Sequence, residues 1–216
     1  MLPWRFKNFI SENFPLLYHK ISNIGVKVNT AAYWDEIYDK EWDSPKRIWP
    51  TKNKLIESET RPTDAILDIA CGTGSILRHL KKKGYQNLYG TEISPMCKRR
   101  LTELGITAFE SHLPKIDYQD DSFDVVIASQ ILEHIIKRDR FLDEIKRVAR
   151  PDATCFLFVP DDCLGPIDEP SHVIKFTRKK LTQLLSKHFT DFSVTSIKDE
   201  NFPMPILYAH IRIPQD

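Results

Sequence analysis

The chain has 216 residues, an apolar fraction of 41% and a formal net charge of +1. Its length allows one domain with one sizeable core, and its charge gives no global sign of a nucleic-acid or acidic partner. The four cysteines form no CxxC pair and show no ligand-like spacing with histidine, which indicates reduced thiols and a cytoplasmic protein. We see neither a signal peptide nor an apolar stretch of the roughly 20 residues that a membrane helix needs.

Residues 1–30 differ from the rest of the chain. Their apolar side chains recur at roughly helical spacing, and basic residues outnumber the single acidic one, Glu12. Pro15 should divide the segment into two short helices. Two interpretations stay open: an arm packed on the following domain, or a basic amphipathic contact with a membrane surface or a partner. We therefore expect an N-terminal helical arm over 1–30 and one domain over 31–216.

From residue 64 onward, short β-branched runs alternate with amphipathic segments. The pattern predicts strands at 65–69, 87–92, 107–109, 123–128, 154–159, 192–197 and 206–213. It predicts helices at 75–83, 95–104, 138–149 and 177–188. This alternation indicates βαβ units with right-handed crossovers, and the short link between the last two strands requires antiparallel pairing. The expected fold class is α/β, with a doubly wound, mostly parallel seven-stranded sheet whose last strand is antiparallel.

A glycine-containing turn, within ILDIACGTGSI at residues 66–76, follows the first predicted strand. Glycine lets a backbone approach a ligand where a Cβ atom would clash, so Gly72 and Gly74 are candidates for a nucleoside site. Such sheets bind ligands beyond the carboxyl ends of their strands. At that edge, Asp68 is placed to meet the ammonium group of an amino-acid tail.

Glu92 ends the second predicted strand, about 20 residues beyond the turn, where a carboxylate can bind both hydroxyls of a ribose. Dinucleotide-binding enzymes also place an acid there. Their fingerprint has a third glycine for close helix packing, and this chain has Leu77 at that position. The turn also lacks a basic group to neutralise a diphosphate. The pattern therefore argues against a dinucleotide.

Four segments resemble, in order, the successive motifs of class I S-adenosylmethionine (SAM)-dependent methyltransferases: ILDIACGTGSILRHL, YGTEISPMC, DDSFDVVIASQILEHI and FLDEIKRVARPDATCFLFVP. The likeness covers roughly 31–200 and is nearest to the small-molecule group that includes the ubiquinone- and menaquinone-pathway enzymes. It implies a Rossmann-like fold, SAM as cofactor and S-adenosylhomocysteine as product. One departure is Pro151-Asp152-Ala153, where the family usually has Pro-Gly-Gly.

The resemblance also implies which residues bind the cofactor. Glu92 would hold the ribose, Ile93 would pack on the adenine, and His112 would stand where the family often has an acid. Ser129 and Gln130 would lie beneath the sulfonium. The full implied set is Tyr33, Asp68, Ala70, Cys71, Gly72, Gly74, Glu92, Ile93, His112, Leu113, Ser129 and Gln130.

Two histidines are candidates for contact with the methyl acceptor. His134 follows the fourth predicted strand and is either a catalytic or substrate contact or a structural cap of the next helix; a general base is needed only for an acceptor that holds its proton tightly. His172 follows the fifth strand and is either a substrate contact or part of a solvated turn.

The stretch Gln130-x-x-Glu133-His134 invites a metal interpretation. Some ubiquinone-pathway O-methyltransferases and small-RNA 2′-O-methyltransferases have Glu-x-x-Glu-His here and bind a divalent ion. In this chain an amide replaces the first carboxylate, and an amide is a poorer ligand for a hard cation. We therefore predict no metal.

The sequence thus predicts a cytoplasmic SAM-dependent methyltransferase that acts on a small molecule, with a glycan or a lipid-linked intermediate as candidate acceptors, the second of which the basic aromatic arm suggests. Peripheral membrane contact through 1–30 stays one of the two open interpretations of the arm, and no nucleic-acid partner is expected. The alternatives are RNA or protein methylation, which would need a clustered basic groove, a non-catalytic SAM-binding or partner-activating module, and a dehydrogenase. The acceptor atom and the oligomeric state stay open.

Overall fold

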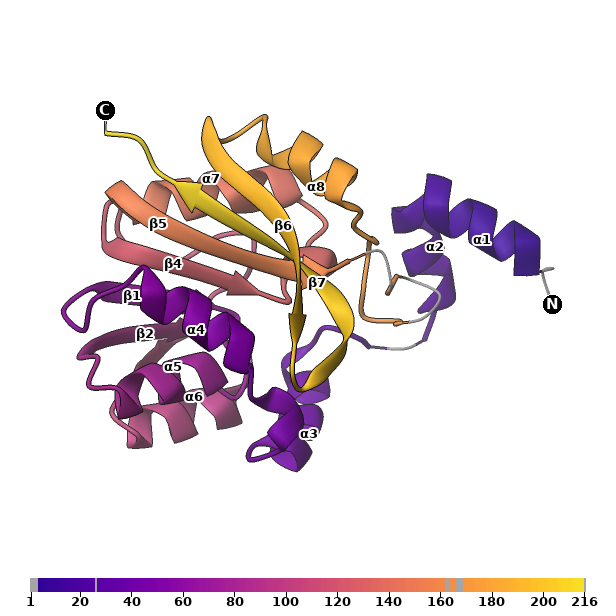
Figure 1. Cartoon of the computed structure of the whole chain (residues 1–216). Coiled ribbons are helices and arrows are strands. Elements are labelled where there is room, and N and C mark those ends of the chain that lie inside the picture. Colours follow the sequence, from indigo (N-terminus) through magenta and orange to yellow (C-terminus); the bar gives the residue numbers. More distant parts are fainter. Residues whose placement is uncertain (1–3, 26, 162–163, 166–168, 216) are drawn as a thin grey trace.

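The structure is a computed structural model that describes residues 4–25, 27–161, 164–165 and 169–215. Seven strands form one sheet in the order β3-β2-β1-β4-β5-β7-β6 (Figure 1). The strands are β1 (Ala65–Ile69), β2 (Asn87–Thr91), β3 (Thr107–Phe109), β4 (Phe123–Ser129), β5 (Ala149–Pro160), β6 (Asp191–Asp199) and β7 (Phe202–Arg212). Strand β7 is antiparallel to both of its neighbours, and the other pairs are parallel. The predicted fold class and the reversed last strand are confirmed, and β7 lies between β5 and β6, one place in from the edge.

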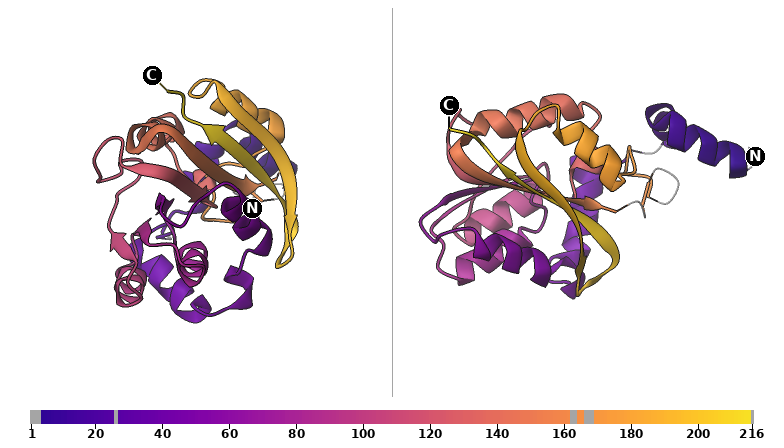
Figure 2. Two further views of the ribbon diagram at one scale, coloured as in Figure 1. Left: turned by 60° about the vertical axis from the view of Figure 1, so that its left-hand side comes forward. Right: turned by 45° about the horizontal axis from the view of Figure 1, so that its top comes forward.

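Helices cover both faces of the sheet (Figure 2). They are α1 (Trp4–Asn13), α2 (Pro15–Ser22), α3 (Ala31–Glu41), α4 (Pro50–Ser58), α5 (Ser75–Lys82), α6 (Pro95–Glu103), α7 (Arg138–Val148) and α8 (Arg178–Leu185), with the 3₁₀ turns η1 (Pro45–Arg47) and η2 (Leu132–His134). Successive side chains of a strand point to opposite faces. Leu67 and Ile69 accordingly pack with α7 and α8, whereas Ile66 packs with α4, α5 and α6. Two apolar cores result, one on each side of the sheet.

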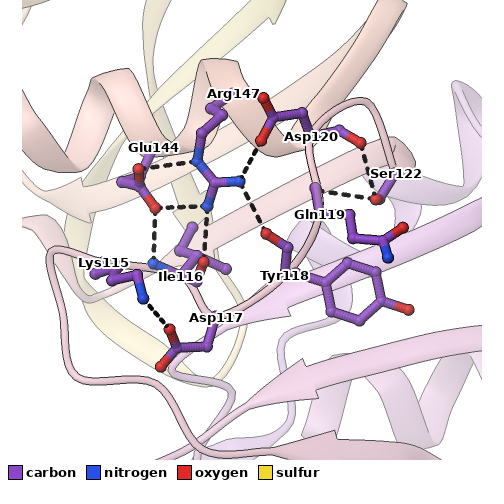
Figure 3. Close-up of polar contacts among 9 residues, drawn as sticks. All are labelled: Lys115, Ile116, Asp117, Tyr118, Gln119, Asp120, Ser122, Glu144 and Arg147. Carbon is purple, nitrogen blue, oxygen red and sulfur yellow. Dashed lines mark hydrogen bonds and ion pairs between the residues drawn. The ribbon is translucent and has the colours of Figure 1, made fainter.

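Arg147 of α7 fixes the connection between β3 and β4 (Figure 3). Its guanidinium donates hydrogen bonds to the carboxylates of Glu144 and Asp120 and to the carbonyls of Ile116 and Tyr118. The guanidinium has five N–H donors in a planar fork, so one side chain can hold several acceptors of a loop at once. The start of this connection carries Ser111, His112 and Leu113 to the carboxyl end of the sheet.

The N-terminal arm divides at Pro15 into α1 and α2, as predicted. Helix α1 stands clear of the sheet and its covering helices in Figure 1 and in the right-hand view of Figure 2. Much of the exposed large apolar surface of the described residues lies on this arm: Phe6, Phe9, Phe14, Leu16, Leu17, Ile21 and Ile24. Within the described ranges, no helix combines the length and the apolar character that crossing a bilayer requires.

Candidate active site

Two adjoining cavities lie beyond the carboxyl ends of β1, β2 and β4. The Asp68 cavity, of about 450 Å³, contains Asp68 and Ser129 in its wall. The Glu92 cavity, of about 250 Å³, contains Glu92 and Ile93. Both walls share Trp34, Tyr38, Ala70, Gln130 and His134. Together the cavities have the size range of small-molecule sites.

The predicted site residues divide between the two cavities. Those at the Asp68 cavity are Tyr33, Asp68, Ala70, Cys71, Gly72, Ser129, Gln130, His134 and His172. Those at the Glu92 cavity are Ala70, Glu92, Ile93, His112, Leu113, Gln130 and His134. Gly74 lines neither of the two cavities.

The first residue after β1 and the first residue after β4 both hold an unusual backbone conformation. Ala70 and Gln130 have φ angles of 53° and 56°, in the left-handed region that costs a residue with a Cβ roughly 1–2 kcal/mol. The backbone N–H groups of Ala70 and Cys71 donate to the hydroxyl and the carbonyl of Thr91, which ties the turn to β2. Backbone strain of this kind concentrates at functional sites. Here it lies at the strand ends where the two cavities meet.

The two glycines of the turn serve different purposes. Gly72 has a φ of 55°, and a Cβ there would lie 2.9 Å from Cζ of Tyr38, whose ring covers the turn. Gly74 has a φ of 63° and begins α5, and a Cβ there would collide with Leu101 of α6. Contact of both glycines with the ligand stays a prediction, and beside Gly74 the side chain of Leu101 on α6 occupies the space that a Cβ would need.

Asp68 and Glu92 are both buried carboxyl groups. Oδ1 of Asp68 has no hydrogen-bond partner among the described residues, and burial raises the pKa of this carboxyl to about 8. The two oxygens of Glu92 accept backbone N–H groups of Gly72 at 2.7 Å and of Ser94 at 2.9 Å. A carboxylate oxygen has more than one lone pair, so Glu92 can still accept hydroxyl donors. The unpartnered oxygen of Asp68 suits a cationic ligand group.

Lys52 is the site residue that the sequence did not reveal. It lies on α4 with its side chain fully buried, and its Nζ donates to Oγ of Ser129 at 2.9 Å. Nζ also lies 3.5 Å from the ring centroid of Trp49. Burial lowers the pKa of Lys52 to about 7, although nearby carboxylates oppose this shift. In the sequence, Lys52 and the exposed Lys54 look alike, and no signal separates them.

The two candidate histidines lie together. Their ring centroids are 4.6 Å apart, and His134 Nδ1 donates to the carbonyl of Ser171 at 3.0 Å. Burial is the largest cause that lowers the pKa values, of His134 to about 3 and of His172 to about 4, so both rings are neutral at pH 7. Since Nδ1 of His134 carries the proton, Nε2 is left as an acceptor.

Both structural alternatives for these histidines are wrong. Helix α7 begins after Lys137 without a side-chain cap, so His134 does not cap it. His172 is buried, which excludes a solvated turn at this residue.

Glu133, His134 and His172 offer ligand atoms that all lie within 4.8 Å of one another. Both carboxylate oxygens of Glu133 lack a hydrogen-bond partner among the described residues. Two imidazoles with one carboxylate form a donor set that divalent transition metals take. Gln130 does not add a second carboxylate, and the absence of a metal stays a prediction.

The family model described as a methyltransferase domain matches residues 67–157. Arginine-hydroxylase NDUFAF5 of Mus musculus is 33% identical over 139 residues, which make up 54% of this chain and 40% of that protein. The ubiquinone/menaquinone biosynthesis C-methyltransferase UbiE of Paraburkholderia xenovorans is 27% identical over 173 residues, 76% of this chain and 70% of that protein. The chain thus spans less than half the length of the mouse relative.

The crystal structure of Burkholderia thailandensis 1,6-didemethyltoxoflavin-N1-methyltransferase contains 1,6-didemethyltoxoflavin and S-adenosylhomocysteine. It matches with a TM-score of 0.67 at 16% identity, covering 86% of this chain and 89% of that one. This likeness shows the shared fold. The methyltransferase-domain match over residues 67–157 and the UbiE relative together support a class I SAM-dependent methyltransferase, for which S-adenosylmethionine is the methyl donor.

Proposed function

We propose that this chain methylates a small-molecule acceptor held in the Asp68 cavity. The observation that carries the proposal is the buried oxygen of Asp68, which has no hydrogen-bond partner among the described residues. It lies at a cavity that adjoins the Glu92 cavity, and the backbone at the strand ends between the two cavities is strained. When bound, SAM supplies a methyl group on a positively charged sulfur. The domain over 31–216 would perform this reaction, and the arm over 1–30 would assist it without supplying reacting groups.

The residues of the two cavities suit the two ends of SAM. Asp68 would receive the ammonium of the amino-acid end, because a charge pair returns the buried carboxyl to its ionised form. Glu92 would accept the ribose hydroxyls, and Ile93 would pack on the adenine. Ser129 and Gln130 would lie near the sulfonium. The same assignment places Tyr33, Ala70, Cys71, Gly72, His112 and Leu113 around the ligand.

The acceptor would occupy the outer part of the Asp68 cavity. Aromatic side chains from three separate segments, Tyr33, Trp49 and Phe202, meet the polar groups of Glu169 and His172 there. A cavity of about 450 Å³ that also receives the amino-acid end of SAM has room for a small molecule or for one end of a larger one. This mixture of rings and hydrogen-bonding groups suits a glycan or a lipid-linked intermediate.

His134 would orient the acceptor and not remove its proton. A general base works best when its pKa lies near the operating pH, and burial lowers that of His134 to about 3. Its free Nε2 can still accept a hydrogen bond from a hydroxyl or amine. Holding the reacting atoms in line is the largest contribution a methyltransferase needs, worth several kcal/mol.

The test is calorimetry of the purified protein with SAM, S-adenosylhomocysteine and NADH, followed by a panel of glycan, lipid, RNA and protein acceptors with release of S-adenosylhomocysteine as the readout. We expect SAM binding and turnover on a small-molecule acceptor. SAM binding without turnover would favour a non-catalytic or partner-activating module. NADH binding without SAM binding would establish a dehydrogenase and overturn the proposal.

The exposed apolar side chains of α1 and α2 support a second proposal, contact of the arm with a membrane surface that carries the acceptor. Phe9 and Leu17 are 54% and 51% exposed. Replacing Phe6, Phe9 and Leu17 by serine should reduce co-sedimentation with anionic liposomes, since burial of each large apolar side chain contributes about 1.5–3 kcal/mol. Leu104→Ser, at a residue 44% exposed on the main domain, is the control. Equal sedimentation of all three proteins would contradict membrane contact.

A further inference from the structure

Lys52 reaches the Asp68 cavity through one intermediary, Ser129. The lysine comes from α4, and its side chain ends behind the carboxyl end of β4. Ser129 and Trp49 line the cavity, whereas Lys52 does not. Since Nζ is 2.9 Å from Oγ of Ser129, a hydroxyl connects the buried amine to the place where a ligand would bind.

Charged groups from four elements face the Lys52 side chain. Asp68 at β1, Glu133 in η2 and Asp199 at β6 favour its ammonium form, and Arg47 in η1 opposes it. Burial opposes the ammonium form most strongly, and the pKa comes to about 7. The neutral amine and the ammonium form of Lys52 are therefore both populated near neutral pH. A group that accepts and releases a proton during a reaction needs both forms.

We propose that Lys52 takes up the proton that the acceptor loses on methylation, with Ser129 as the relay. The inference rests on the proposed function and applies to an acceptor with an O–H or N–H group. His134 and His172 are poor destinations for this proton, because burial keeps both rings neutral. Asp68 would already be paired with an ammonium.

The step balances in atoms and charge. The acceptor's O–H or N–H bond breaks, its proton joins Oγ of Ser129, and the hydroxyl proton of Ser129 joins the lone pair on Nζ of Lys52. The electron pair on the acceptor atom forms the bond to the methyl carbon, and the carbon–sulfur bond breaks with its pair kept on sulfur. One positive charge thus leaves the ligand and one appears on Lys52.

Like-charge repulsion makes this exchange testable without an acceptor. A positively charged sulfonium close to Ser129 disfavours the ammonium form of Lys52, whereas the neutral sulfur of S-adenosylhomocysteine does not. Both ligands carry the same amino-acid tail, so any proton change at Asp68 is common to them. SAM should therefore release more protons from the protein on binding than S-adenosylhomocysteine does.

The experiment measures the affinity of the whole chain for both ligands from pH 5.5 to 8.5, with protons counted by calorimetry in buffers of different ionisation enthalpy. For the wild type, the affinity ratio of SAM to S-adenosylhomocysteine should rise with pH, by up to about tenfold per unit below the pKa of Lys52, since one proton is linked to binding. Lys52→Arg, which stays charged, should bind SAM more weakly and remove that rise. Lys52→Met should also remove the rise in the affinity ratio with pH. It should not show the weaker SAM binding of Lys52→Arg, because methionine has no charge to repel the sulfonium.

Lys54→Met provides the matched control, because Lys54 is on the same helix with its side chain 77% exposed. This variant should keep the wild-type pH profile. Ser129→Ala should lower turnover by at least about tenfold more than it lowers SAM affinity, since a positioned proton-transfer group contributes about 100-fold or more.

Several outcomes would overturn the inference. If Lys52→Arg retains the wild-type pH profile and turnover, Lys52 is only a charge partner of Asp68 and Glu133. If Ser129→Ala turns over at the wild-type rate, the proton follows another route. Failure of the wild type to bind SAM or to turn over overturns the proposed function, and this inference with it. If the Lys52 variants do not fold, Ser129→Ala alone still decides whether the relay exists.

Discussion

The two cavities are built in different ways. The Glu92 cavity lies at consecutive strand ends, with the turn after β1, the end of β2 and the 111–113 segment side by side. The outer wall of the Asp68 cavity comes from α3, from Trp49, Leu164 and Phe202, and from the 169–172 segment, which are far apart in the chain. The first region depends on the register of the sheet, and the second depends on individual side-chain contacts.

These contacts gather on the 169–172 segment. Backbone carbonyls of Pro170 and Ser171 accept hydrogen bonds from Asn23 and Asn29. His134, from η2, donates to the same Ser171 carbonyl. Strand pairing holds many residues cooperatively, whereas each of these bonds contributes only about 1 kcal/mol. We call the Glu92 cavity, together with Asp68 and the turn after β1, the cofactor region, and the outer wall of the Asp68 cavity the acceptor region. We infer that the cofactor region resists change and that single substitutions can alter the acceptor region.

The largest expected effect is in the cofactor region. Asp68→Asn should lower SAM affinity about 100-fold, because the amide cannot pair with an ammonium and a hydrogen bond to a charged group is worth about 1.5–3 kcal/mol. Calorimetry of the folded variant measures this loss. SAM affinity within a few-fold of the wild type would contradict the placement of the amino-acid end.

The same variant should change the pH dependence of stability. In the fold the pKa of Asp68 is about 8, above its unfolded value of 3.8, so the native state holds a proton that the unfolded chain has lost between these pH values. The contribution of Asp68 to the stability of the ligand-free wild type should therefore fall as pH rises from 4 to 8, by up to about 1.4 kcal/mol per unit. Asp68→Asn should remove that part of the slope, and Asp117→Asn, at an exposed residue, should not. Equal slopes in all three proteins would contradict the burial argument.

A smaller effect is expected where α3 covers the turn. Gly72→Ala places a methyl group against the Tyr38 ring at a left-handed φ, whereas Gly84→Ala has a φ of 89° and nothing within 4 Å of the new atom. Both variants should lose about 1–2 kcal/mol of stability from the backbone. Only Gly72→Ala should also weaken SAM binding, since Tyr38 must move. If both variants bind SAM equally well, the Tyr38 ring does not control the turn.

The contrast between the two regions also explains how much the sequence could predict. Periodicity and turn residues placed β1 and β3 at their observed bounds, and glycine and acid spacing located the turn and Glu92. These signals are local, because strand ends are set by a few adjacent residues. The predicted strand at 154–159 proved too short, since β5 begins at Ala149. That strand continues through the polar residues Arg150 and Asp152, which hide it from an apolar pattern.

The acceptor region could not be predicted in the same way. Lys52 becomes part of the site because α4 packs over strand ends that follow it in the chain, and nothing in its neighbours indicates burial. His172 could be named as a candidate, but its contact with His134 joins residues 38 positions apart. Gly74 shows a packing requirement that the motif did not reveal, since the missing Cβ leaves room for Leu101 of α6 beside the start of α5.

The smallest expected effect tests whether the arm supports the acceptor wall. Asn23 donates from Nδ2 to the Pro170 carbonyl at 3.0 Å, and it lines neither of the two cavities. Asn23→Ala should speed amide hydrogen exchange at 171–173 and raise the KM for the acceptor by about fivefold, the equivalent of one hydrogen bond of about 1 kcal/mol. SAM affinity should not change, because the cofactor residues are held by the sheet.

Asn13→Ala is the matched control for this prediction. Asn13 is at the end of α1, and its side chain donates to the Phe9 carbonyl within the same arm. The substitution therefore removes an asparagine and one hydrogen bond from the arm and leaves the contacts of the 169–172 segment unchanged. If both variants leave exchange at 171–173 unchanged, the arm only adjoins the site. If both raise SAM dissociation instead, the two regions are coupled through α3, and the division between a sheet-held cofactor region and a separately held acceptor region fails.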